Sequence, residues 1–141
     1  YVRSGGMIYF DSLRAGDGFG LRCLERLLRQ LPADASVELT KEHVLFRTFY
    51  LLDNPVGRGL VDTQAQSAQL DGRMVALAAD VDLAGALIRD EFGAWAFSCE
   101  PGGEPQRERA IRFGVNLIMY ALCTDYKADQ VHIPFLLKRR R

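Results

Sequence analysis

The stretch YVRSGGMIYFDS, residues 1–12, decides how the fold is interpreted. Its apolar and aromatic run MIYF, residues 7–10, predicts a strand, and the polar pair Asp11 and Ser12 ends that strand. The two glycines before the strand, preceded by a basic residue, are typical of the end of a helix. We therefore expect the domain to begin upstream, so that this chain is truncated on its amino-terminal side.

Strand-like and helix-like patterns alternate along the rest of the chain. Leucines on one face predict an amphipathic helix over residues 21–31. RMVALAAD, residues 73–80, is continuously apolar, as a strand buried on both faces is. A mostly buried helix is predicted over Pro105 to Cys123, with an apolar stripe that consists of Ile111, Val115, Ile118 and Leu122 and is widened by Phe113, Leu117 and Tyr120. The alternation predicts a layered α/β fold with a mostly parallel sheet.

The composition is that of an ordinary globular domain. Of the 141 residues, 48% are hydrophobic and 26% are charged, which is enough for one core, so we expect a single, partial domain over residues 1–141. Eighteen basic residues balance eighteen acidic ones, and this neutrality predicts no nucleic-acid partner. The three cysteines are odd in number and widely spaced, which indicates buried thiols rather than a disulfide framework or a metal site.

Polar residues follow two of the predicted strands. Asp11 and Ser12 follow the first, and Asp80 and Asp82 follow RMVALAAD. Because parallel strands place ligands at their carboxyl ends, these four residues are binding candidates, with Asp11 also a candidate acid or base. The alternative is that they only cap the helices that follow. The nearby glycines match neither the dinucleotide fingerprint nor the P-loop, so no cofactor is expected.

The two histidines lie far apart in the sequence. His43 is a candidate catalytic group, although an imidazole bonded to a nearby loop carbonyl is the alternative. His132 lies in YKADQVHIP, residues 126–134, where it joins Lys127 and Asp129 as a binding candidate. That segment either orders the chain end against the core or presents a partner surface. No metal is expected, and no nucleophile elbow of the Gly-x-Ser-x-Gly type is present in the sequence.

Several segments resemble one bacterial family. RFGVNLIMYALCTDYKADQVHIP, residues 112–134, closely follows the RFGVNLVMYALTGNYKADQVHVP pattern of the family catalogued as domain of unknown function 4159. YVRSGGMIYFDS and EHVLFRTFYLLD, residues 42–53, resemble two earlier segments of the same family. DLAGAL, residues 82–87, resembles the family's DWAAAW, but leucines replace both tryptophans. The resemblance covers nearly the whole chain and identifies it as the carboxyl-terminal part of such a domain.

The resemblance implies an architecture more than a chemistry. The family is similar to class I glutamine amidotransferase-like domains, which are flavodoxin-like three-layer sandwiches. In active amidotransferases the strand corresponding to residues 7–10 carries the cysteine nucleophile, whereas here it ends in Asp11 and Ser12. A carboxylate cannot replace a thiolate in glutamine hydrolysis, so amidotransferase activity is not expected. Many members resemble the carboxyl-terminal domains of proteins whose amino-terminal parts resemble aerotolerance-regulator membrane segments.

Two functional hypotheses follow from these observations. The first is a non-catalytic ligand-binding or protein-interaction domain of a membrane-anchored bacterial envelope protein. Its partner would be a small molecule or a protein, and it would meet the inner membrane only through segments outside this chain, because no run of about twenty apolar residues is present. The domain itself is expected to be soluble, on a side of the membrane that the sequence leaves open. The alternative is a hydrolase-like enzyme in which Asp11 and His43, together with Asp82, act as base and orienting groups.

Overall fold

A mixed four-stranded sheet forms the centre of the computed structural model, which describes residues 1–31, 36–59 and 64–138, with side chains up to Cys123. The strands are β1 (Ile8–Phe10), β2 (Val37–Glu38), β3 (Gln66–Leu70) and β4 (Arg73–Ala78), and they lie in the order β1-β4-β3-β2. β1 runs parallel to β4, whereas β3 is antiparallel to both β4 and β2. The α/β class predicted from the sequence is confirmed.

The expected mostly parallel sheet is replaced by a mixed one because β3 and β4 form a hairpin. Asp71 and Gly72 connect these strands, and both residues have a positive φ, 53° and 74°. A connection of two residues can only join antiparallel neighbours, since a parallel pair needs a crossover. The sequence predicts a turn at Asp71 and Gly72, because Asp-Gly is a turn signal, and a loop or an edge hairpin over residues 57–69. The structure shows that the last part of this segment belongs to the strand β3.

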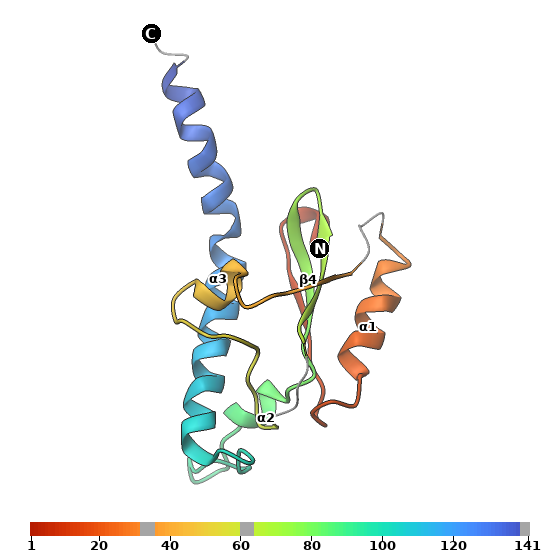
Figure 1. The fold of residues 1–141 in the computed structure, drawn as a ribbon, viewed down its shortest axis with the longest axis vertical. Helices are drawn as coiled ribbons and strands as arrows, with labels where there is room; N and C mark the ends of the chain where they lie inside the picture. Colours follow the sequence, from red (N-terminus) through yellow and green to blue (C-terminus); the bar gives the residue numbers. More distant parts are fainter. Residues whose placement is uncertain (32–35, 60–63, 139–141) are drawn as a thin grey trace.

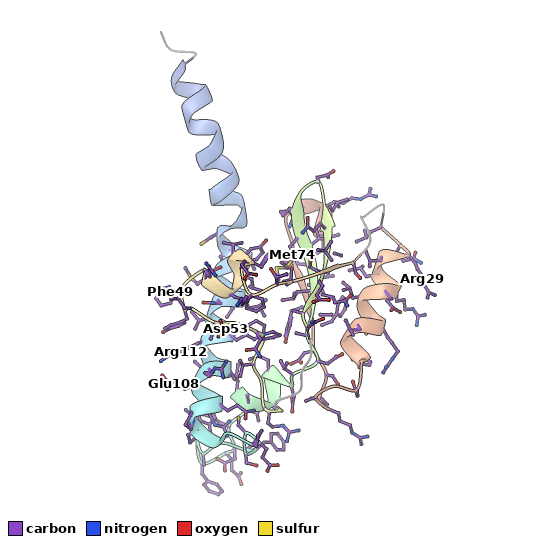
Figure 2. The ribbon with its side chains drawn as sticks, viewed as in Figure 1. Arg29, Phe49, Asp53, Met74, Glu108 and Arg112 are labelled. Carbon is purple, nitrogen blue, oxygen red and sulfur yellow. The ribbon has the colours of Figure 1, made fainter. Side chains whose placement is uncertain are left out.

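Helices lie on both faces of the sheet (Figure 1). α1 (Phe19–Leu28) packs on one face, where Leu24 joins a cluster with Val75 and Ala78. α2 (Leu83–Leu87), α3 (Gly103–Lys138) and the 3-10 helix η2 (Val44–Arg47) belong to the other side. Figure 2 shows Met74 between the sheet and α3, in the core cluster that also holds Phe46, Leu77 and Phe113.

The chain before β1 contains the 3-10 helix η1 (Val2–Ser4), which Gly5 closes in the left-handed conformation at φ 98°. The sequence predicted a helix end at this place, and the structure confirms that a helical turn closes here. Within the part of the chain that the structure describes, no helix combines the length and the apolar character needed to cross a membrane.

α3 buries only part of the apolar surface predicted for it. Phe113 and Leu117, which widen the predicted stripe, are buried as expected, but Ile118 and Leu122 of the stripe itself are 60% and 73% exposed, and Ile111 is exposed as well. Two apolar stripes occupy this helix, and the sheet covers the one that carries Phe113. α3 also continues past the predicted end at Cys123 to Lys138. The side chains of Lys127, Asp129 and His132 lie outside the described part of the chain.

Candidate functional site

The carboxyl ends of β1 and β4 lie side by side because these strands are parallel neighbours. Asp11 follows β1, and Asp80 and Asp82 follow β4, so the three carboxylates predicted from the sequence converge at one edge of the sheet. α2 lies at this edge, at the lower end of the molecule in Figure 1. We refer to this edge of the sheet, where Asp11, Asp80 and Asp82 converge, as the carboxyl edge.

Asp11 is saturated by backbone donors. Its Oδ1 accepts hydrogen bonds from the N–H groups of Ser12 (2.9 Å), Val81 (3.3 Å) and Asp82 (3.0 Å). Its Oδ2 accepts from the N–H groups of Leu83 (2.6 Å) and Ala84 (3.3 Å). The last two groups belong to the first turn of α2, whose N–H groups have no partner within the helix. The carboxylate therefore caps α2 from outside its own segment.

The surroundings of Asp11 keep the neighbouring phenol neutral. Burial, and then the negative charge of Asp11, raise the pKa of Tyr9 well above its usual value, and Asp80 and Asp82 act in the same direction. The Tyr9 hydroxyl donates a hydrogen bond to the carbonyl oxygen of Ala79 at 3.2 Å. Burial also raises the pKa of Asp11, while its backbone donors act to lower it. Tyr9 and Asp11 thus form a half-buried pair that fixes the end of β1.

Asp80 connects β4 to the start of α1. Its Oδ1 accepts a hydrogen bond from the backbone N–H of Gly20 at 2.7 Å, and its carbonyl oxygen accepts one from Gly16 at 2.8 Å. A Cβ atom on Gly20 would lie only 2.7 Å from the same carboxylate oxygen. The side chain of Asp80 is buried, so it is held by the first turn of α1 and is not presented to solvent.

Asp82 caps α2 directly. Its backbone has φ 56°, and its Oδ1 accepts a hydrogen bond from the N–H of Gly85 at 3.0 Å. Its Oδ2 forms an ion pair with Nε of Arg58. Arg58 approaches because Gly57 has no side chain, and a Cβ atom there would lie 2.1 Å from the carbonyl oxygen of Val81. Asp11, Asp80 and Asp82 therefore all accept hydrogen bonds from backbone N–H groups in the first turn of a helix, as the capping alternative predicts.

The loop after Ser12 forms the outer surface of the carboxyl edge. The Ser12 hydroxyl is buried and donates to the Asp17 carboxylate at 2.7 Å. That hydroxyl and the N–H of Phe19 lower the pKa of Asp17. Leu13 and Phe19 are exposed, and together with Asp11, Ser12, Arg14 and Asp17 they line a cavity of about 270 Å³. The loop thus presents apolar groups to solvent around a small hollow.

His43 lies elsewhere. It caps η2, where its Nδ1 accepts a hydrogen bond from the N–H of Leu45 at 3.1 Å, and its ring centroid lies 5.8 Å from that of Tyr120. Burial lowers its pKa. η2 packs against α3, away from α2 in Figure 1, and no hydrogen bond joins His43 to Asp11. The structure does not bring together the pair that the hydrolase hypothesis requires.

Arg58 is a site residue that sequence reasoning missed. Besides Asp82, its guanidinium contacts two segments: Nη2 donates to the carbonyl oxygen of Leu13 at 3.3 Å, and the group lies 5.4 Å from the ring centroid of Phe97. The signal in the sequence was Gly57-Arg58-Gly59, in which a charged residue stands between two glycines. The local sequence did not show which other segments of the chain these two glycines approach.

A second hollow shares no residue with the carboxyl edge. It measures about 370 Å³, and its lining includes Glu38, Lys41, Glu42 and Asp53. These charged side chains belong to exposed residues.

Across residues 1–31, 36–59 and 64–123, no group of three or more His, Cys, Asp or Glu side chains is arranged to hold a metal ion.

Comparison with known proteins identifies the family of the chain. The family model described as Domain of unknown function (DUF4159) matches residues 1–122, and the chain belongs to this family. The family membership predicted from the sequence motifs is thus confirmed. A search of curated proteins finds no match.

Proposed function

We propose that this chain is a non-catalytic recognition domain that binds a ligand or a protein at its carboxyl edge. The observation that carries the proposal is the contrast between Asp11 and Leu13. The carboxylate of Asp11 is occupied by five backbone N–H groups, whereas Leu13, two residues later, is 74% exposed beside a cavity. A general base needs a lone pair directed at the substrate. Two exposed apolar side chains that line one hollow, Leu13 and Phe19, are instead typical of a contact surface.

The wider setting of the domain is part of the same proposal. We propose a relationship to the flavodoxin-like, amidotransferase-like sandwiches, with this chain as the carboxyl-terminal part of such a domain. The motif resemblance, the parallel pair β1 and β4, and helices on both faces of the sheet support it. The resemblance of many family members to proteins with membrane segments supports a place in a membrane-anchored bacterial envelope protein.

Site-directed photo-crosslinking in the bacterium that makes the protein tests the recognition role. A photo-reactive amino acid replaces Leu13 in the full-length protein, and in a matched control it replaces Leu122, which has nearly the same exposure at 73%. A discrete crosslinked product from position 13, absent from position 122, is the expected result. No product at position 13, or equal products at both positions, contradicts the proposal.

A further inference from the structure

Residues 88–97 form a short ribbon with a fixed tip. The N–H of Asp90 donates to the carbonyl oxygen of Ala94 at 2.8 Å. The carboxylate of Asp90 in turn accepts hydrogen bonds from the N–H groups of Phe92 (2.9 Å) and Ala94 (2.8 Å). Phe92 stands at this tip and is 87% exposed. An aromatic side chain is therefore presented to solvent on a turn whose backbone is tied by several hydrogen bonds.

The base of the ribbon is anchored to α3 through Trp95. The guanidinium groups of Arg89 and Arg107 lie 3.7 Å and 4.5 Å from the centroid of the Trp95 ring, within the range of cation–π attraction. Arg107 is buried on α3 and donates to the carbonyl oxygens of Ala86 and Phe97, each at 2.5 Å. Because the ribbon is held at its base, Phe92 would lose little conformational freedom on binding.

Arg58 makes the ribbon continuous with the loop of the proposed site. Its guanidinium lies between the carbonyl oxygen of Leu13 and the ring of Phe97, both of which belong to exposed residues. Leu13 and Phe97 thus border the same charged group. We refer to residues 11–19, 57–59 and 88–97 together as the recognition face.

The accessible charge around the recognition face is more acidic than basic. Over residues 11–19, 57–59 and 88–104, whose charged residues are all exposed or half-buried, six residues are acidic and three are basic, although the whole chain is neutral. Acidic charge around exposed apolar groups attracts a cationic partner and disfavours an anionic one. Aromatic side chains that project from the surface suit the contact core of a protein interface, where such residues carry much of the binding energy.

We propose that the recognition face binds a basic segment of a partner protein, whose apolar side chains pack against Leu13, Phe92 and Phe97. This inference rests on the proposed function, because it uses the same carboxyl edge. It adds the class of partner and extends the contact surface to the ribbon. Hydrophobic contact with the aromatic side chains supplies affinity, and the acidic surroundings supply selectivity for a cationic sequence.

Isothermal titration calorimetry of the full chain with a short peptide of alternating leucine and lysine tests the proposal. Saturable binding that weakens with added salt is the expected result. A peptide in which glutamate replaces every lysine serves as the control and is expected not to bind. Equal binding of both peptides, or no binding of the lysine peptide, overturns the proposal.

Three variants separate this inference from the proposed function. Phe92→Ser and Leu13→Ser are each expected to weaken binding of the lysine peptide about tenfold, the effect of removing a strong contact residue. Leu122→Ser is the matched control and leaves binding unchanged. If Leu13→Ser weakens binding and Phe92→Ser does not, the ribbon is not part of the surface, and only this inference fails. If neither variant has an effect, the peptide does not bind at the recognition face and this inference fails, whereas crosslinking at position 13 decides the proposed function separately.

Both contact residues are exposed, so these variants should fold, and their circular dichroism spectra are expected to match that of the parent chain.

Glu91→Lys gives an independent test that keeps every apolar contact, and it is expected to weaken binding of the lysine peptide at low salt. Analytical ultracentrifugation tests whether a second copy of the chain occupies the recognition face instead. Self-association that Phe92→Ser abolishes would assign the recognition face to a second copy of the chain and overturn the proposal.

Discussion

Asp11 and Leu83 are 72 residues apart in the sequence, yet the carboxylate of Asp11 accepts a hydrogen bond from the backbone N–H of Leu83 at 2.6 Å. This bond joins the end of β1 to the first turn of α2. It places the most obvious catalytic candidate of the sequence in a capping role. The carboxyl edge is therefore organised by its acidic residues, while its outer surface is formed by the loop and ribbon that they support.

Replacing Asp11 by Asn is expected to destabilise the fold. The amide group would place a donor against the N–H groups of Leu83 and Ala84, and the N–H of Leu83, a buried residue, would lose its acceptor at a cost of about 1–3 kcal/mol. The free energy of unfolding in urea measures the effect. Asp53→Asn, at an exposed residue, is the control and should change stability little. Unchanged stability of the Asp11 variant together with a lost cellular function would return Asp11 to a catalytic role.

His43 is expected to make the stability of the fold depend on pH. Burial lowers its pKa in the folded state below the value in the unfolded chain, so the unfolded chain binds the proton more readily. Its contribution is complete above a pH of about 6.5 and is lost as the pH falls below that value. His43→Asn keeps an acceptor at the cap of η2 but does not titrate. Unfolding free energies from about pH 7 to pH 5 should fall less in this variant than in the parent chain; equal slopes would contradict the assignment.

Gly57→Ala is expected to disrupt the carboxyl edge. The new Cβ would lie 2.1 Å from the carbonyl oxygen of Val81. Neither atom can move away by a side-chain rotation, so the backbones around Gly57 and Val81 must separate, at a cost of about 1–3 kcal/mol. Gly114→Ala is the matched control on α3, because the nearest atom there is 3.8 Å away and alanine favours the helix by about 1 kcal/mol. Thermal unfolding should show opposite shifts for the two variants. The same shift in both would refute the close approach.

Arg58→Met is expected to leave the buried carboxylate of Asp82 without its cation. A hydrogen bond to a charged group contributes about 1.5–3 kcal/mol, and the partial exposure of Arg58 reduces this to about 1–2 kcal/mol. Glu108→Gln breaks an exposed ion pair with Arg112 on the outer side of α3 (Figure 2) and should cost about 0.5 kcal/mol. Equal losses in urea unfolding would show that Arg58 has no special place at the carboxyl edge.

The sequence allowed the convergence of Asp11, Asp80 and Asp82 to be predicted, because polar residues after two buried strands meet wherever those strands are parallel neighbours. It did not decide between capping and catalysis, which depends on where the N–H groups of α2 lie. Those groups come from residues about seventy positions away from Asp11, and no local pattern encodes such a distance.

Which part of its apolar surface α3 buries was also beyond local prediction. Its two apolar stripes, one with Ile118 and Leu122 and the other with Phe113 and Leu117, are both compatible with a helix that packs on a sheet. The ring of Tyr9 meets that of Phe113 edge to face at a centroid distance of 6.3 Å, and this contact from β1 marks the stripe that the core covers. Only the tertiary arrangement shows which of the two apolar stripes packs against the core.

Hydrogen–deuterium exchange of the full chain, with and without the leucine–lysine peptide, tests the central claim most directly. If the carboxyl edge is a recognition surface, the peptide should slow exchange in residues 12–19 and 88–97 together. Exchange in residues 44–51, beside α3, should stay the same. Slowing confined to residues 44–51, or no slowing in either segment of the recognition face, would contradict the account.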